Sequence, residues 1–340
     1  MDSVAKISAL LAFGTGFLAQ HATASQSHPL SIDDRILARS ALLVEAKTGR
    51  VIFSREPDQL HQPASTIKLL TALVTAEETG LRGMAKVNTR DIAISTPGAS
   101  TANLRDGSMH SVFDLTRLLL VRSSNDVASV LAAHVAGNEA AFVRKMQIRA
   151  RELGALSTVV RNPHGLPDSQ QLTTARDLLR IFQAVLANPT LRSFCQEPLA
   201  TINTVNGPVT FANTNKLLRT YPGMGPAKTG YTRSARHTYV ASACRNGREL
   251  HLVLLNSPNK WADARALFDH GFAVLEGRNP VASHPRPANN PPAEPPKPAQ
   301  VVRKAVVVHK KVPEATPFDE IVAGNKLPKR RAAVQEPGDR

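Results

Sequence analysis

The segment PASTIK at residues 63–68, followed by a run of apolar residues, constrains the fold of this chain more than any other stretch. Pro63 suits the first turn of a helix, and the apolar residues that follow recur at the i, i+3, i+4 and i+7 spacing of a buried helix. We therefore expect Ser65 at the N-terminus of that helix, with Lys68 on the same face. The Lys68 amine could then take the hydroxyl proton and make Ser65 a nucleophile.

A lysine acts as a base near neutral pH only where burial or a neighbouring cation lowers its pKa. The helix N-terminus would also favour negative charge developing beside Ser65. Taken alone, however, a Ser-x-x-Lys pair is more often a solvated helix end. The motif therefore needs support from the rest of the chain.

Two further motifs supply that support. The first follows the apolar residues 118–121 and precedes a helical pattern, so we expect it in a loop between helices. The second follows the Gly- and Pro-rich residues 221–226 and leads toward a strand. They are, in chain order, Ser123-Ser124-Asn125 and Lys228-Thr229-Gly230.

The composition divides the chain into three parts. Residues 1–24 have the pattern of a secretory signal peptide, so we expect an exported protein of the periplasm or cell envelope, with a retained N-terminal anchor as the alternative. Residues 30–275 are long enough for one packed domain. Residues 278–340 are Pro-rich and basic, and we expect them to form a disordered tail.

Strand patterns lie near both ends of the folded part, and helical patterns lie between them. We expect hairpins from residues 40–44 with 51–53 and from 238–244 with 249–255, the latter around an Asn-Gly turn. Helices are expected over 112–122, 126–136 and 141–153, with a last helix that includes 263–268. These patterns predict one sheet, built from distant parts of the chain, with helices packed on it.

The net charge of +15 and the sequence pI of about 10.3 suggest an anionic partner. Scarce aromatic residues, the absence of a nucleic-acid motif and the expected export argue against nucleic acid. We expect electrostatic contact of the basic tail with the envelope instead. Cys195 and Cys244 could pair in an exported protein, and neither has a Cys or His at the spacing of a metal site.

With these three motifs in this order, the chain resembles the low-molecular-mass penicillin-binding proteins that act as serine D-alanyl-D-alanine carboxypeptidases. The resemblance covers roughly residues 38–272 and implies a serine β-lactamase/DD-peptidase-like fold. This is an α/β fold of the α+β type, a mainly antiparallel sheet flanked by helices with a helical subdomain. The resemblance includes Asn162-Pro163-His164-Gly165-Leu166, Thr174-Ala175-Arg176-Asp177 and Val240-Ala241-Ser242-Ala243.

The resemblance also implies a mechanism. Ser65 would attack the carbonyl between two terminal D-alanines of a peptidoglycan stem peptide, with Lys68 as general base. Ser123 would relay a proton to the leaving D-alanine, and the charge of Lys228 would keep Lys68 neutral. A β-lactam would acylate Ser65 and leave slowly. No metal or organic cofactor is needed.

The remaining motif residues would bind the substrate. Asn125 would hold a peptide amide, and the strand that continues from Thr229 and Gly230 would receive the peptide as an added strand. The backbone N–H groups of Ser65 and Tyr231 would form the oxyanion hole.

Three positions depart from the family pattern. Relatives commonly use an arginine after the final strand to bind the substrate's terminal carboxylate. By position this role falls to Lys260, which keeps the charge but loses the bidentate fork, and a solvated loop lysine is the alternative. Arg236 and Ser124 stand where relatives usually have glycine, and Arg236 could crowd the strand entrance or offer a substitute cation.

Two further features need separate interpretation. His164 lies between proline and glycine, so we expect a structural role in a tight turn rather than proton transfer. Residues after Gly277 show neither the β-rich second domain nor the amphipathic anchor of many relatives, so any membrane attachment would be electrostatic.

Rival functions remain open. A β-lactamase with these motifs needs a deacylating glutamate, and none of the three between Asn125 and Lys228 has the expected Glu-x-x-Leu-Asn context. An endopeptidase that cuts D-alanyl cross-links would use the same site. A non-catalytic cell-wall-binding protein would not need the complete proton-transfer set. The three glutamates are Glu139, Glu152 and Glu197.

Overall fold

The computed structural model describes residues 31–92, 100–204 and 207–278. The expected signal peptide over 1–24 and the expected tail, apart from Arg278, lie outside the described residues. No helix within the described ranges is long and apolar enough to cross a membrane.

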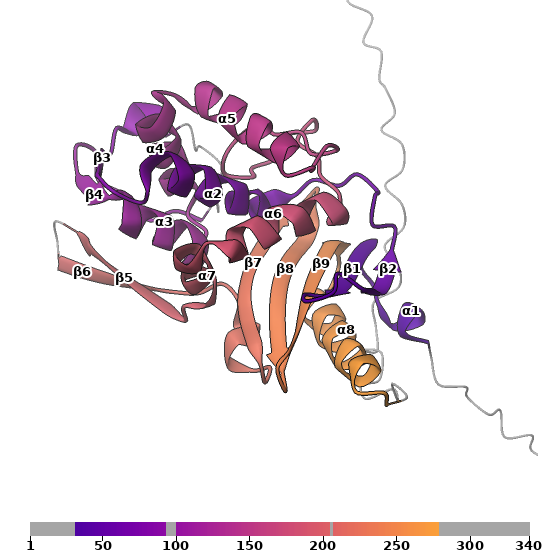
Figure 1. The fold of residues 1–340 in the computed structure, drawn as a ribbon. Coiled ribbons are helices and arrows are strands. Elements are labelled where there is room, and N and C mark those ends of the chain that lie inside the picture. Colours follow the sequence, from indigo (N-terminus) through magenta and orange to yellow (C-terminus); the bar gives the residue numbers. More distant parts are fainter. Residues whose placement is uncertain (1–30, 93–99, 205–206, 279–340) are drawn as a thin grey trace, which may run out of the picture. The chain divides into compact units, whose positions relative to one another are not determined.

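A five-stranded antiparallel sheet in the order β2-β1-β9-β8-β7 forms the centre of the domain (Figure 1). The N-terminal strand β1 pairs along its whole length with the C-terminal strand β9, which confirms a sheet built from distant parts of the chain. Strand β7 forms one edge. The strands are β1 (Ser40–Glu45), β2 (Val51–Arg55), β7 (Met224–Thr232), β8 (Arg236–Arg245) and β9 (Arg248–Ser257).

Both expected hairpins are present. In the β8–β9 turn, Asn246 and Gly247 have φ values of 52° and 72°. Positive φ at both central residues is the geometry that Asn-Gly favours, because it matches the twist of the flanking strands.

Helices cover both faces of the sheet (Figure 1). The expected helices correspond to α2, α3, α4, α5 and α8, while α6, α7 and the β5–β6 hairpin were not expected. The α-helices are α1 (Ile32–Arg35), α2 (Lys68–Thr79), α3 (Val112–Val121), α4 (Asn125–Ala136), α5 (Glu139–Glu152), α6 (Ala175–Ala187), α7 (Pro189–Gln196) and α8 (Lys260–Leu275). Short elements are η1 (Ala64–Ile67), η2 (Thr89–Asp91), η3 (Lys216–Arg219), β3 (Met84–Lys86), β4 (Met109–Ser111), β5 (Leu199–Thr204) and β6 (Gly207–Ala212).

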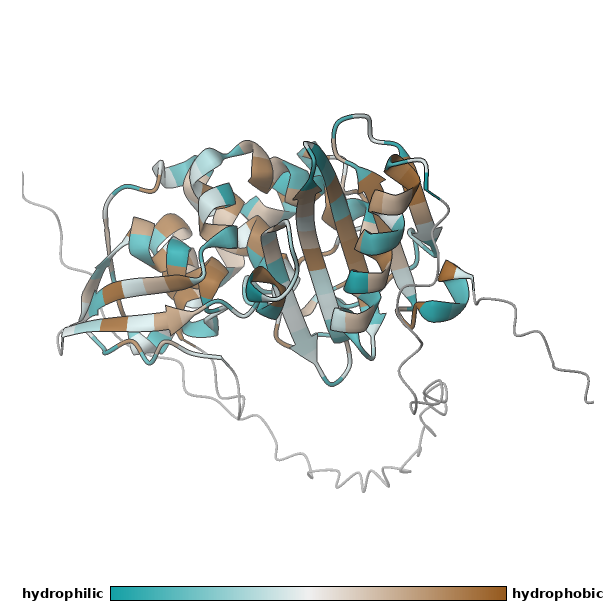
Figure 2. Cartoon of the chain, turned by 90° about the horizontal axis from the view of Figure 1, so that it is seen from below, coloured by the Kyte–Doolittle hydropathy of each residue, from teal (hydrophilic) through white to brown (hydrophobic). Residues whose placement is uncertain are grey.

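The alternation of side chains along β9 divides the core into two layers. Leu252 and Leu254 pack with Phe268 of α8, while Val253 and Leu255 belong to the cluster formed by the helices on the other face. Figure 2 shows apolar residues along the middle of the sheet strands. Because both faces are buried, the sheet is a rigid platform for its edge strand β7.

The two cysteines do not pair. Cys195 is buried on α7 and Cys244 is exposed on β8, and both are free. Burial raises the pKa of the Cys195 thiol to about 12, so the group stays protonated near neutral pH.

Candidate active site

Ser65 lies on the 3₁₀ turn η1 that leads into α2, so the expectation of an α-helical N-terminus is corrected. Ala64 has a left-handed φ of 47°, and the Thr66 hydroxyl donates to the Pro63 carbonyl at 2.6 Å, which tightens the turn. Residues i and i+3 eclipse in 3₁₀ geometry. Lys68 therefore stands directly beside Ser65, with Nζ 2.9 Å from Oγ.

Two glycines hold this turn in place. A Cβ at Gly165 would lie 2.0 Å from the Ala64 carbonyl oxygen, and a Cβ at Gly230 would lie 2.8 Å from the Ser65 nitrogen. Both distances are shorter than any tolerable contact, so only glycine permits the loop and the edge strand to approach the nucleophile from either side.

Lys68 is fully buried and has three polar partners. Its Nζ donates to Asn125 Oδ1 at 2.6 Å and to the His164 carbonyl, and the third partner is Ser65 Oγ. The first two oxygens can only accept. A neutral amine has two N–H groups and one lone pair, so once both N–H groups are donated, the lone pair is left for the Ser65 hydroxyl.

The electrostatic surroundings favour this neutral amine. Burial lowers the pKa of Lys68 well below its ordinary value, and the charge of Lys228 lowers it further, against an opposing effect of Asp126. The geometry and the pKa shift both describe a buried base directed at Ser65.

Ser123 and Lys228 form a second buried pair. Lys228 Nζ donates to Ser123 Oγ at 2.7 Å and to the Thr229 carbonyl at 2.9 Å. Ser123 lies between α3 and α4, as expected, with a left-handed φ of 69°. Burial is the main cause that lowers the pKa of Lys228 to about 7, opposed by Cys195 and assisted by Lys260.

Lys228, Thr229 and Gly230 lie within strand β7 rather than before a strand, which corrects the expected position. The Thr229 hydroxyl donates to the hydroxyl of Thr214 at 2.8 Å. Tyr231, one residue further, is 61% exposed. Because β7 is an edge strand, an extended peptide could pair with it.

Lys260 is buried at the first turn of α8, so the reading as a solvated loop lysine is wrong. Its Nζ lies 2.9 Å from His237 Nδ1 and 4.6 Å from the centre of the Trp261 ring. Burial, followed by the charge of Lys216, lowers the pKa of Lys260 to about 8. Burial, followed by Lys260 and Arg236, lowers the pKa of His237 to about 4, so a neutral His237 accepts from a charged Lys260 near pH 7.

The two positions at which relatives usually have glycine behave differently. Arg236 has a φ of 57°, a left-handed conformation that glycine adopts without strain. Ser124 is the N-cap of α4 with an extended backbone, and its buried hydroxyl has no hydrogen-bond partner among the described residues. Only at Arg236 does the backbone conformation therefore favour glycine.

The loop of residues 162–166 contributes to the site through its backbone as well as its side chains. The His164 side chain has the expected structural role, because Nδ1 accepts from the Leu166 N–H at 3.2 Å. The Asn162 side chain accepts from the Gly165 N–H at 2.7 Å. The backbone carbonyl of His164, which no sequence motif could identify, is a partner of Lys68.

Comparisons with known proteins identify the family of the chain. A family model described as D-alanyl-D-alanine carboxypeptidase matches residues 22–259. The D-alanyl-D-alanine carboxypeptidase DacB2 of Mycobacterium tuberculosis is 36% identical over 254 residues, which are 72% of this chain and 84% of the relative. A D-alanyl-D-alanine endopeptidase of Pseudomonas aeruginosa is 32% identical over 273 residues, 76% of this chain and 86% of the relative.

Solved structures show the same fold. The crystal structure of a D-alanyl-D-alanine carboxypeptidase from Mycobacterium tuberculosis has a TM-score of 0.67 and 34% identity, and covers 73% of this chain and 95% of that one. This similarity confirms the expected DD-peptidase-like fold. The chain belongs to the D-alanyl-D-alanine carboxypeptidase family of serine peptidases.

Proposed function

We propose that this chain removes the terminal D-alanine from peptidoglycan stem peptides through an acyl-enzyme on Ser65. One observation carries this assignment. The two N–H groups of a neutral Lys68 are taken by Asn125 Oδ1 and the His164 carbonyl, so its lone pair remains for the Ser65 hydroxyl 2.9 Å away.

In the first step, Ser65 Oγ attacks the carbonyl carbon between the two D-alanines and its proton passes to Lys68. The backbone N–H groups of Ser65 and Tyr231 stabilise the oxyanion, and Gly230 permits the two to approach each other. Ser123, hydrogen-bonded to Lys228, passes its proton to the leaving amine as the C–N bond breaks and recovers a proton from the protonated Lys68. Water then hydrolyses the ester and restores the Ser65 hydroxyl.

The substrate pairs with the edge strand β7, and Asn125 binds a peptide amide with its NH₂ group while Lys68 holds its oxygen. Lys260 supplies the charge for the terminal carboxylate. No carboxylate within the described part of the chain forms an ion pair with this buried lysine, so the substrate itself can provide the counter-charge.

This unpaired charge favours a carboxypeptidase, because its substrate always carries a free terminal carboxylate directly after the cleaved bond. The endopeptidase remains the second candidate because a relative with that name matches most of the chain. Incubation with a cross-linked muropeptide dimer separates the two. Release of monomers at a rate equal to D-alanine release would favour the endopeptidase.

Labelling with a fluorescent penicillin tests the acyl-enzyme. Wild type should give a covalent adduct that mass spectrometry places on Ser65, and Ser65→Ala should give none. Ser54→Ala, an exposed serine on the edge strand β2, is the matched control and should label normally. A folded wild type without an adduct would support the non-catalytic cell-wall-binding reading, and rapid loss of the adduct would support a β-lactamase.

We also propose that the chain works in the cell envelope, with residues 1–24 removed on export and the basic tail in electrostatic contact with anionic envelope polymers. The N-terminal sequence of protein recovered from the envelope fraction should begin at Ser25. Recovery of the uncleaved chain from the cytoplasm would contradict this localisation.

A further inference from the structure

A cavity of about 770 Å³ lies at the end of the sheet where the two hairpin turns meet. The turn between β1 and β2 supplies one part of its lining, and the turn between β8 and β9 supplies another. Helices α6 and α7 supply the opposite side through Gln183, Leu186 and Arg192. None of the residues assigned to the active site lines this cavity, so it is a separate place on the domain.

Cations outnumber carboxylates in the lining. Arg192 donates to Glu249 at 2.8 Å, so these two charges compensate each other. The other cations are exposed, and their side chains make no hydrogen bond or ion pair within the described ranges. They are Lys47, Arg50 and Arg248. The other carboxylate, Glu45, accepts from the Thr48 hydroxyl at 2.6 Å.

A buried histidine lies at the same cavity. His251 of β9 is 6% exposed, and its ring lies 5.8 Å from that of Phe182 on α6. Its Nε2 is 3.5 Å from Glu249 Oε1, and a hydrogen bond from this ring is the largest cause that lowers the pKa of Glu249, while Nδ1 has no hydrogen-bond partner among the described atoms. With Nε2 directed at Glu249, Nδ1 is left as a buried ring nitrogen without a partner, which opposes folding. A polar ligand in the cavity would satisfy it.

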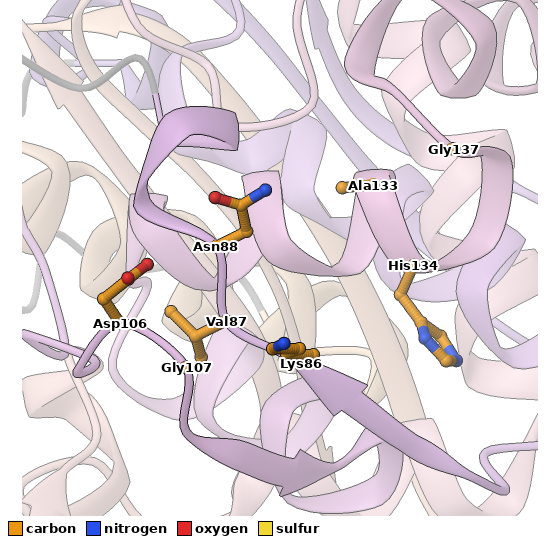
Figure 3. A pocket seen from close by; sticks show the side chains of 8 residues that line it. All are labelled: Lys86, Val87, Asn88, Asp106, Gly107, Ala133, His134 and Gly137. Carbon is orange, nitrogen blue, oxygen red and sulfur yellow. The ribbon is translucent and has the colours of Figure 1, made fainter.

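A second cavity shows how this one differs. It measures about 490 Å³ beside β3 and the C-terminal end of α4 (Figure 3). Figure 3 shows Asp106 and His134 at opposite ends of it, with Lys86 between them. His134 is exposed and Asp106 accepts from Thr89, so among the described residues that line this space no buried polar side chain lacks a partner. This second cavity has charged residues at the surface but, among its described lining residues, no buried side chain that is available to bind a ligand.

We propose that the cavity at the hairpin turns binds an organic phosphate ester. Guanidinium groups donate to phosphate oxygens in pairs, and a phosphate dianion carries enough charge and acceptors for Arg50, Arg248 and Lys47 together. His251 Nδ1 accepts a hydrogen bond from a hydroxyl group of the ligand. The volume falls in the range of small-molecule sites, so the ligand has a polar body beyond the phosphate group.

Isothermal titration of the purified full chain at constant ionic strength tests this site, with glycerol 3-phosphate, inorganic phosphate and glycerol as probes. Glycerol 3-phosphate should bind at one site more tightly than inorganic phosphate, and glycerol should not bind. Arg50→Gln should weaken the binding of glycerol 3-phosphate by about tenfold or more, since it removes a charge-assisted hydrogen bond. His251→Phe should weaken it similarly.

The matched control is Lys86→Gln, which removes a cation from the other cavity and should leave the affinity unchanged. No saturable binding of glycerol 3-phosphate, or equal weakening by Arg50→Gln and Lys86→Gln, would overturn the proposal. Because Arg50 is exposed on a turn, its variant should fold even if His251→Phe does not.

A polymer probe identifies the source of the phosphate. Poly(glycerol phosphate) that binds more tightly per phosphate than the monomer would identify a cell-wall polymer, and binding of the monomer alone would identify a free metabolite. Either result supports the site. Penicillin labelling of the same variants should be unchanged, so failure here is distinguishable from failure of the proposed peptidase function.

Discussion

The Ser65 hydroxyl and the Lys68 amine lie 2.9 Å apart because a 3₁₀ turn, not an α-helix, joins them. In an α-helix, residues three apart are offset by about 60° around the axis, whereas in a 3₁₀ turn they align. The nucleophile and its base are thus fixed by the backbone before substrate arrives. The protonation state of Lys68 then decides whether the pair can react.

The acylation rate should vary with pH according to the protonation states of the two buried lysines, Lys68 and Lys228. Acylation requires neutral Lys68 and charged Lys228, so the labelling rate should rise with pH as Lys68 loses its proton. Because the pKa of Lys228 is about 7, the rate should fall again as the pH rises through this value. Stopped-flow labelling with fluorescent penicillin from pH 5 to 10 measures both limbs.

The variant Lys228→Met tests separately how Lys228 affects the rising limb and the falling limb of the pH profile. It removes the charge that lowers the pKa of Lys68, so the rising limb should move to higher pH, and the falling limb near pH 7 should disappear. Lys145→Met, an exposed lysine paired with Glu78, should keep the wild-type profile. A falling limb that persists in Lys228→Met would show that another group causes it.

Stability should also depend on these lysines. Burial lowers the pKa of Lys228 to about 7 and that of Lys260 to about 8, while the unfolded chain titrates near 10.5. The unfolded state therefore binds more protons between these values, and the free energy of unfolding should increase as the pH rises from 7 to 10. The Lys228 contribution is roughly 3 kcal/mol. Urea denaturation at pH 7 and pH 10 measures the difference.

Replacing Lys228 by methionine should raise the free energy of unfolding at pH 7 and reduce its increase toward pH 10. Lys145→Met, which removes an exposed lysine, should leave that increase as in wild type. If both variants show the wild-type increase, the buried lysine does not titrate as its surroundings imply.

Gly230 should tolerate no side chain. An alanine Cβ there would lie 2.3 Å from Thr238 Oγ1 and 2.8 Å from the Ser65 nitrogen, so the edge strand or the Ser65 turn must move. Displacement by a fraction of an ångström to 1 Å lowers rates by about 10²-fold, and we expect this loss in penicillin acylation for Gly230→Ala. Gly225→Ala on the same strand, with its nearest contact at 3.3 Å, should stay within about fivefold of wild type. Equal rates for the two would contradict the argument.

Elements with strong local signals were predictable from sequence. The Asn246-Gly247 turn fixed one hairpin, and the apolar spacing after Val112 and after Asp126 fixed two helices. The β5–β6 hairpin was harder to predict, because only Ala200 and Ile202 of β5 are buried while β6 exposes residues such as Val209. Helix α6, although not expected, has a clear amphipathic pattern in its sequence.

Within the site, the sequence motifs identified which side chains lie together but not the backbone conformation that brings them together. The 3₁₀ turn depends on Ala64 adopting a positive φ, which requires the distant Gly165 and Gly230 to lie against it. Such tertiary contacts leave no local pattern in the sequence. The burial of Lys260 likewise depends on tertiary contacts that the local sequence does not show. The start of α8 did have a local signal, because Asn259 caps the helix by accepting from the Ala262 N–H.

Arg236→Gly should stabilise the protein. The left-handed φ of 57° disfavours a residue with a Cβ by roughly 1–2 kcal/mol, and the greater freedom of glycine in the unfolded chain offsets part of this gain. A net increase of about 0.5–1 kcal/mol in the free energy of unfolding is expected from urea denaturation. Arg233→Gly, in the same turn without positive φ, should instead lower stability. Destabilisation of equal size in both variants would contradict the strain at Arg236.

Glu139 should support the catalytic lysine through His164. The Leu166 N–H donates to His164 Nδ1, so Nε2 carries a proton and faces Glu139 Oε1 at 3.6 Å, while the carbonyl of the same histidine holds Lys68. Glu139→Gln should loosen this orientation and slow penicillin acylation by about tenfold, by analogy with the lower end of the loss when a partner that orients a metal ligand is replaced. Glu152→Gln, at the other end of α5 and paired with Arg149, should keep the wild-type rate and melting temperature. A wild-type rate in Glu139→Gln would mean that the loop alone orients His164, and a lowered melting temperature with an unchanged rate would confine Glu139 to packing.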